Sequence, residues 1–165
     1  MEIVISKMQQ EHWERVKQIY EDGIATGNAT FETKAPTWEA WDKGHLATCR
    51  LVALVNNEAV GWVALSPVSS RCVYQGVAEV SIYIKNGYTG KKIGSKLMDA
   101  LIEESEKTGF WTLEAGVFTE NSASLKLHQK AGFRIVGTKE RISKMDGKWR
   151  DVVILERRSK VIGND

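Results

Sequence analysis

Hydrophobic and polar positions alternate along several short stretches of the chain and recur at helical spacing along others. Alternation with a period of two predicts strands, whereas apolar residues three and four positions apart predict amphipathic helices. Strand patterns cover residues 2–6, 50–55, 59–67, 77–84 and 111–117, and the segments FRIVGTK and WRDVVILER near the end. Helical patterns cover residues 11–25, a short segment from Thr37, residues 90–107 and residues 121–130.

The order of these elements is β-α-α-β-β-β-α-β-α-β-β. Strands adjoin early, around Asn56-Asn57-Glu58, and again at the end, around Met145-Asp146-Gly147, which predicts two hairpins. Between the hairpins strands alternate with helices. We therefore expect a mixed sheet with helices on its faces, in the α/β (α+β) class. The 165 residues predict a single domain over residues 1–160 and a short tail over residues 161–165.

Composition narrows the possible partners. The formal net charge of +2 is too small to argue for a nucleic-acid or membrane partner. Cys49 and Cys72 have no metal-binding spacing and form no disulfide framework, so we expect reduced thiols and no metal site. The N-terminus does not resemble a signal peptide, and no apolar run is long enough to span a membrane. We expect a cytoplasmic protein.

A segment rich in glycine and lysine follows the strand predicted at residues 77–84. Gly90 and Gly94 would let the backbone approach a ligand closely, and Lys91 and Lys92 add positive charge. The first amides of the helix that begins here lack intrahelical partners and carry a partial positive charge. The segment suits a pyrophosphate, although it lacks the Walker and dinucleotide-binding spacings and is also compatible with an ordinary loop bearing surface lysines.

A carboxylate, Glu79, interrupts the apolar pattern of the same strand. Alternation places it on one face with Val77, Ser81 and Tyr83. In open α/β sheets ligands bind beyond the carboxyl ends of strands, so a carboxylate here could accept a proton from a bound amine. The alternative is a polar strand face that meets only water.

Four motifs together resemble one enzyme family. They are NSASLKLHQKAGF at residues 121–133, which fits N-x-x-[AS]-x-x-L-[YH]-x-[KR]-x-G-F, and the stretches ATFET, RCVYQGVAE and AEVSIYI. The chain resembles the GCN5-related N-acetyltransferases (GNAT), in particular the phosphinothricin and arsinothricin N-acetyltransferase branch. The resemblance implies the GNAT fold, with a mostly antiparallel sheet of about six to seven strands. The family's cofactor loop, [QR]-x-x-G-x-[GA], corresponds to residues 89–94, where Thr89 and Lys92 depart from the pattern and Gly94 conforms to it.

The resemblance also implies where the ligands bind. The family's cofactor is acetyl-CoA, and its pantetheine arm pairs with the strand backbone that corresponds to residues 80–84 of this chain. The implied cofactor contacts are Ile82, Tyr83, Ile84, Thr89, Gly90, Lys91, Lys92, Ile93, Gly94, Ser95, Asn121, Ser124 and Lys130. The implied substrate contacts are Phe31, Arg71, Tyr74, Glu79 and Tyr83. Glu79 would be the general base, and His128 would protonate the leaving thiolate where many relatives have tyrosine. From the residues alone, His128 could be a structural histidine and Arg71 a surface arginine.

The function implied is acetyl transfer to the α-amine of a small glutamate-like amino acid or analogue, such as phosphinothricin, arsinothricin or methionine sulfoximine. No cysteine lies in a nucleophile setting, so we expect direct attack in a ternary complex. The resemblance also implies a homodimer. Two alternatives remain at this point: a non-catalytic acyl-CoA binding or sensor module with the same fold, and an enzyme that binds ATP at the glycine-lysine segment.

Overall fold

A computed structural model describes residues 1–165 and shows one seven-stranded sheet in the order β1-β2-β3-β4-β5-β7-β6. The strands are β1 (Val4–Lys7), β2 (Leu51–Val55), β3 (Glu58–Pro67), β4 (Val77–Ile84), β5 (Thr112–Phe118), β6 (Arg134–Met145) and β7 (Lys148–Arg158). The helices are α1 (Trp13–Ala25), α2 (Trp38–Gly44), α3 (Ile93–Lys107) and α4 (Ser122–Lys130), with short 3-10 turns at Gln10–His12 and Cys72–Tyr74. The predicted element order, fold class and pair of hairpins are confirmed.

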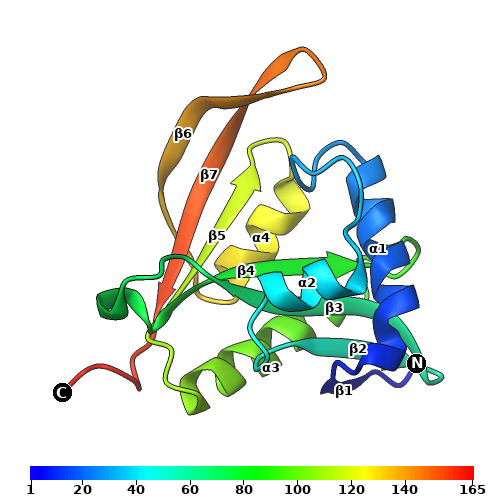
Figure 1. Cartoon of the computed structure of the whole chain (residues 1–165), viewed down its shortest axis with the longest axis horizontal. Coiled ribbons are helices and arrows are strands. Elements are labelled where there is room, and N and C mark those ends of the chain that lie inside the picture. Colours follow the sequence, from blue (N-terminus) through cyan, green and yellow to red (C-terminus); the bar gives the residue numbers. More distant parts are fainter.

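Hydrophobic residues cover both faces of this sheet. On one face α1 and α2 pack through Trp13, Trp41 and Val16 against Trp62 of β3 (Figure 1). On the other face α3 packs through Leu97, Met98, Leu101 and further residues of the larger core. Full burial of one such side chain contributes about 1.5–3 kcal/mol, so the two cores hold the helices firmly against the sheet.

Local signals set several helix boundaries. The Thr37 side chain accepts a hydrogen bond from the Ala40 amide and caps α2, and Asn121 accepts one from Ser124 and caps α4. The third helix begins at Ile93, not at Gly90 as predicted. Gly90 and Lys92 both have left-handed backbone, with φ of 74° and 67°, and this conformation cannot continue a right-handed helix.

The sheet splits in the middle. β4 pairs with β5 in parallel over only three positions, which end at Glu79 opposite Glu114. Beyond them β4 stays paired with β3 as far as Ile84, and β5 stays paired with β7 as far as Phe118. The edges of β4 and β5 that would face each other are therefore unpaired, and Figure 1 shows the two strands diverging.

Two features lie outside the compact part of the fold. β6 and β7 form a long hairpin that rises above the rest of the molecule in Figure 1, and all of β6 except Met145 is exposed. The last residues turn back on themselves, where Arg158 donates hydrogen bonds to the carbonyl oxygens of Ile162 and Gly163. None of the helices combines the length and the hydrophobicity that a bilayer-spanning helix requires.

Candidate active site

The Glu79 side chain lies where β4 and β5 part. Part of it is open to solvent and part is covered, whereas Val77, Ala78 and Val80 beside it are buried, so it is a carboxylate on an otherwise apolar part of the strand. Its neighbour across the parallel pairing is Glu114. A carboxylate at the base of the split can reach both a ligand between the strands and the solvent.

Both burial and neighbouring charges change the pKa of Glu79. Partial burial raises its pKa above the usual value, the nearby Glu114 carboxylate raises it further, and Lys139 opposes both effects. Glu114 is in turn paired in register with Glu156, which forms an ion pair with Arg134 of β6. A row of three carboxylates therefore crosses β4, β5 and β7, and only the outermost one is neutralised directly by an arginine.

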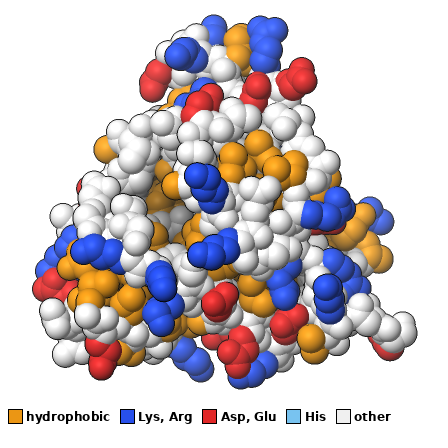
Figure 2. All heavy atoms as spheres, turned by 180° about the vertical axis from the view of Figure 1, so that it is seen from behind, with side chains coloured by type: hydrophobic (Ala, Val, Ile, Leu, Met, Phe, Trp, Pro, Cys, Tyr) orange, Lys and Arg blue, Asp and Glu red, His pale blue; other side chains and the backbone are white.

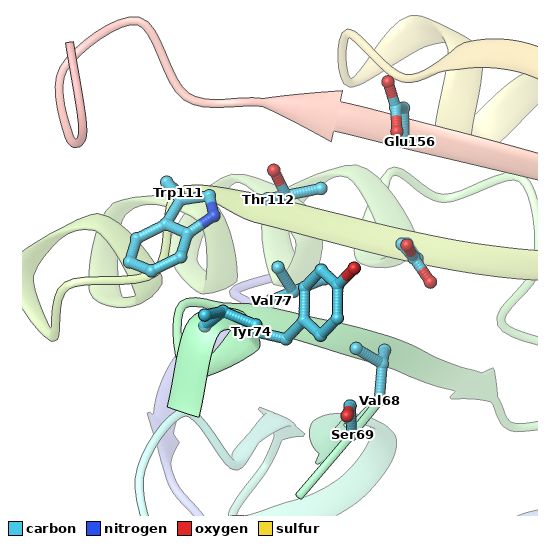
Figure 3. A pocket seen from close by; sticks show the side chains of 9 residues that line it. Val68, Ser69, Tyr74, Val77, Trp111, Thr112 and Glu156 are labelled. Carbon is cyan, nitrogen blue, oxygen red and sulfur yellow. The ribbon is translucent and has the colours of Figure 1, made fainter. Parts of the chain in front are cut away.

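An open groove of about 540 Å³ begins at this row, on the side toward the start of β4. Figure 3 shows the Tyr74 ring lying across Val77, with its hydroxyl on the side of β5. The groove is lined by Val68, Ser69, Val73, Tyr74, Val77, Trp111, Thr112, Glu114 and Glu156. The Arg71 guanidinium lies over the Tyr74 ring, 5.5 Å from its centre. It forms no ion pair with an acidic residue, so its N–H groups are free to bind an anionic ligand.

The loop after α1 lies at the other end of the split. The Phe31 ring meets Phe118 of β5 edge to face, with ring centres 4.8 Å apart. Asn121 donates a hydrogen bond from its side-chain nitrogen to the Asn28 carbonyl, at 3.2 Å. Figure 1 shows this loop beside the end of β5 and the start of α4. Residues 26–32 therefore cover the end of the split that is farther from Tyr74.

These positions divide the predicted substrate contacts into two groups. Arg71 and Tyr74 lie near the start of β4, whereas Phe31 and Tyr83 lie near its end. Val77 and Tyr83 are six positions apart, which corresponds to roughly 20 Å of strand. Glu79 lies between the two groups, and the groove that Tyr74 lines includes neither Phe31 nor Tyr83.

Tyr83 is mainly a packing residue in this structure. Its ring stacks on Trp62 with centres 5.0 Å apart and meets the Tyr20 ring at a tilt, with centres 4.9 Å apart. A Cβ at Gly23 would lie 2.6 Å from the ring, so α1 can approach β4 here only through a glycine. Burial raises the pKa of the Tyr83 hydroxyl far above its usual value, which keeps it neutral. The neighbouring Ile82 and Ile84 pack against the larger core.

The start of α3 has the features of an anion site. No side chain caps this helix, and Lys91 and Lys92 are exposed beside its first turn. A Cβ at Gly90 would meet no other atom within 4 Å, so the backbone there is open to a ligand. Figure 2 shows the face opposite to α1 and α2, with many Lys and Arg side chains across its middle. Free amides, open backbone and basic side chains together suit a diphosphate.

Gly94 has a packing role that the sequence did not predict. A Cβ at this position would lie 3.1 Å and 3.2 Å from the two methyl groups of Leu127. The glycine therefore allows α3 and α4 to pack closely, and its missing side chain faces α4. Ser95 follows in the same turn, and Lys130 is exposed at the end of α4.

His128 is buried, with 2% of its surface exposed. Its Nδ1 lies 2.7 Å from the Ser124 carbonyl oxygen, so Nδ1 carries a proton and donates it. Its Nε2 is buried without a hydrogen-bond partner. Burial lowers the pKa of His128, while the hydrogen bond to Ser124 acts in the opposite direction. The imidazole is therefore neutral near pH 7, with an Nε2 lone pair and no Nε2 proton.

Several residues of this site are absent from the sequence-based prediction. Alternation within β5 places Thr112, Glu114, Gly116 and Phe118 on one face, but the pattern does not say which strand lies beside it. Arg150 of β7 contacts the loop of residues 26–32 although it is more than 100 residues away. A search for charged residues inside strand patterns would have found Glu114 and Arg150 as candidates, without their partners.

The residues present fit acetyl-CoA. The unpaired edge of β4 offers backbone donors and acceptors that an extended arm can use, and the open, uncapped start of α3 offers amides and lysines to a diphosphate. The two regions are joined directly by residues 85–92, so one elongated ligand can reach both.

Comparisons with known proteins identify the family and the fold. The profile of the Acetyltransferase (GNAT) family matches residues 11–133. YwnH of Bacillus subtilis strain 168, which carries a provisional name as a phosphinothricin acetyltransferase, is 35% identical over 149 residues, covering 87% of this chain and 91% of YwnH. An L-methionine sulfoximine/L-methionine sulfone acetyltransferase of Salmonella typhimurium is 27% identical over 106 residues, covering 64% of this chain and 62% of that protein.

A solved structure has the same fold. A GNAT superfamily phosphinothricin acetyltransferase from Sinorhizobium meliloti, in complex with AcCoA, superimposes with a TM-score of 0.86. The alignment covers 100% of this chain and 97% of that one, at 22% identity. At this identity the similarity establishes the fold.

Proposed function

The chain belongs to the GNAT acetyltransferase family, whose members use acetyl-CoA, and we propose that it acetylates the α-amine of a small glutamate-like amino acid or analogue. Two relatives support this acceptor class. YwnH is named for phosphinothricin and covers most of the chain, and the Salmonella typhimurium enzyme is named for methionine sulfoximine and methionine sulfone. Arsinothricin belongs to the same chemical class.

Acetyl-CoA would supply an acetyl thioester, and this chain offers distinct groups to its two ends. The backbone of Val80 to Ile84 would hold the pantetheine arm, because this edge of β4 has no strand partner. The amides at the start of α3, with Lys91 and Lys92, would hold the diphosphate. A strand amide beside the thioester would stabilise negative charge on its oxygen.

Glu79 would take the proton from the amine. The position of its carboxylate at the fork between β4 and β5 is the single observation that carries the proposal. An amino acid's amine is mostly protonated at neutral pH and has no lone pair in that form, so a base is required, directly or through a water molecule. Burial and Glu114 raise the pKa of Glu79, which makes its carboxylate a stronger base.

His128 is poorly prepared to act as an acid. Its neutral form donates from Nδ1 to Ser124, and its lowered pKa makes the cationic form scarce at neutral pH. A thiolate with a pKa near that of free cysteine, about 8.5, can also leave without an acid. We therefore propose that catalysis does not require proton donation by His128.

Arg71 and Tyr74 would bind the acidic part of the acceptor. The Arg71 guanidinium is in no ion pair, and its planar fork matches a carboxylate or phosphinate group. The carboxylate row on β4, β5 and β7 would attract the substrate's ammonium group toward Glu79. The positive charge of Arg71, beside Tyr74, and the negative charge of this row would together orient a zwitterionic or anionic amino acid.

We also propose that the enzyme is a homodimer. The β6–β7 hairpin exposes about half of the surface of Ile135, Val136, Ile142 and Trp149. Such apolar exposure on a protruding hairpin is typical of a protein interface. Light scattering on the purified chain should give twice the monomer mass, and a monomer at micromolar concentration would exclude this assembly.

A turnover screen tests the enzymatic proposal. Release of CoA thiol would be measured for the wild type with acetyl-CoA and a panel of phosphinothricin, methionine sulfoximine, glutamate and neutral amino acids. Glutamate analogues should be preferred, and Glu79→Gln should abolish most of the rate. Thermal shift with acetyl-CoA and with ATP provides the control for cofactor choice. Absence of turnover with every amine, despite acetyl-CoA binding, would overturn the proposal.

A further inference from the structure

We propose that Arg150 determines the enzyme's affinity for its amino-acid substrate by holding residues 26–32 over the split between β4 and β5. The inference rests on the proposed function, because it assigns this loop to the acceptor side of the site. Arg150 lies in β7, on the protruding hairpin, and touches none of the predicted cofactor contacts through a hydrogen bond. It is a positioning residue, not a catalytic one.

The Arg150 guanidinium connects three parts of the chain. Its Nη1 donates to the Gly27 carbonyl oxygen at 2.9 Å, and its Nη2 donates to the Asn28 side-chain oxygen at 2.8 Å. Nη2 also lies 3.2 Å from a carboxylate oxygen of Glu120 in the turn between β5 and α4. The Arg150 side chain is only 11% exposed, although its partners Asn28 and Glu120 remain open to solvent.

The same guanidinium supports the aromatic pair beside the split. It lies over the Phe118 ring, 4.0 Å from its centre, while Phe31 meets that ring with its edge. Phe118 is thus held between Arg150 and the loop's own phenylalanine. Removal of the guanidinium would release both the loop backbone at Gly27 and the ring on which Phe31 packs.

Few other long-range hydrogen bonds hold this loop. The side-chain hydroxyls of Thr26 and Thr30 bond to groups within three residues along the chain, and Gly27 has a φ of 73°. Two further links join the loop to other elements: Asn121 donates to the Asn28 carbonyl, and the Thr30 side chain interacts with the hydroxyl of Tyr83 in β4. A loop fixed at so few points opens at low free-energy cost, so loss of Arg150 should make it mobile.

Arginine is needed here because one planar group must donate in two directions and stack on a ring. Lysine keeps the positive charge but has a single ammonium that cannot do all three. Arg150→Lys therefore separates loop positioning from net charge. A matched control is Arg141→Lys, because Arg141 lies on the same hairpin, stacks on Trp149 and has no side-chain hydrogen bond to the loop.

The test combines kinetics with hydrogen exchange. Arg150→Lys should raise KM for the amino acid about tenfold or more, as misplacement of a positioning element can, and leave the acetyl-CoA dissociation constant within about twofold. Amide exchange in residues 26–32 should become faster, while exchange in α3 stays unchanged. Arg141→Lys should change neither. Combining Asn28→Ala with Arg150→Lys should raise KM little further, since both substitutions remove the same hydrogen bond.

Two results would overturn the inference: unchanged exchange in residues 26–32 of Arg150→Lys, or an equal loss of affinity for both substrates. Failure of the proposed function is distinguishable from either. If the wild type acetylates no amino acid, the acceptor assignment fails, and the exchange measurement still decides whether Arg150 holds the loop.

Discussion

Glu79 and Glu114 face each other at the last position of the only parallel strand pair in the sheet. Beyond this pair the two strands separate, so the carboxylates stand at the inner end of the opening. Partial burial raises the pKa of Glu79, and the neighbouring Glu114 carboxylate raises it further. The same strand pair therefore sets both the place where β4 and β5 separate and the raised pKa of Glu79.

Glu79→Gln tests the base. We expect kcat to fall about 10²-fold or more and its pH dependence to flatten, because glutamine is nearly isosteric and cannot accept the proton. Acetyl-CoA affinity should stay unchanged, which calorimetry can check. Glu39→Gln, on α2, serves as a control for the loss of one charge. A variant with normal kcat and an intact pH profile would remove Glu79 from the mechanism.

Glu114→Gln tests whether the Glu114 carboxylate raises the pKa of Glu79. The Glu114 carboxylate raises the pKa of Glu79, so its removal should lower that pKa. The acidic limb of the kcat/KM profile reports deprotonation of the base and should move to lower pH, and the rate above it should fall modestly because the base is weaker. A full pH profile of each enzyme supplies the measurement. A shift of the limb to higher pH would contradict the coupling.

Arg71→Ala tests the acceptor site. Loss of a charge-assisted fork to a carboxylate should raise KM for the amino acid by roughly tenfold or more and leave acetyl-CoA binding nearly intact. Initial rates at varied amino acid, with acetyl-CoA saturating, give the first quantity, and a direct titration gives the second. Arg15→Ala removes an exposed ion pair with Glu58 and should affect neither constant. Equal damage to both constants would place Arg71 elsewhere in the mechanism.

Gly94→Ala tests the packing of α3 on α4. The added methyl group would lie 3.1 Å from Leu127, and the strain of this contact outweighs the gain that alanine brings to a helix, so we expect a net loss of up to about 2 kcal/mol of unfolding free energy. Leu127→Ala in the same chain should recover part of the loss that the clash causes. Gly137→Ala is the control, because a Cβ there meets nothing within 4 Å and its φ is not positive. Urea denaturation of the wild type and the three variants measures the effect, and full stability of Gly94→Ala would mean that Leu127 moves aside without cost.

The pH dependence of stability tests the state of His128. Its pKa is lowered in the folded protein by burial, whereas in the unfolded chain it is about 6.5. The unfolded chain therefore binds the proton first as the pH falls, so the stability is complete above about pH 6.5 and declines below it. His45, whose pKa burial also lowers, adds to the slope. His128→Leu should show a shallower decline by urea titration between pH 7 and 5, and an unchanged slope would mean that His128 is not buried as a neutral base.

Local sequence was sufficient for the elements and for some of their ends. The caps at Thr37 and Asn121 and the spacing of Ile93, Leu97 and Leu101 act over one or two turns, so the chain itself displays them. The same holds for the face on which Glu79 lies, because side chains in a strand alternate. Where conformation depended on a less common backbone angle, as at Lys92, the predicted helix start was three residues early.

Gly94 has a physical reason for being glycine that the local sequence does not display. In the sequence it stands beside lysines at a helix start, which suggested room for a ligand. In the structure its missing Cβ makes room for Leu127, a residue of another helix. No local pattern contains that information, because the distance between α3 and α4 is set by the packing of both on the sheet.

The sequence by itself determined the order of strands and helices, the family resemblance and the identity of the carboxylate at position 79. Only the tertiary structure decided that Glu114 stands beside it, that β4 and β5 part at this pair, and that Arg150 holds the loop at Gly27 and Asn28. The physical reason is the separation along the chain over which each interaction acts. Alternation, capping and helical spacing arise between neighbours in the chain, whereas strand register and side-chain contacts across more than 100 residues exist only once the hydrophobic cores have brought those segments together.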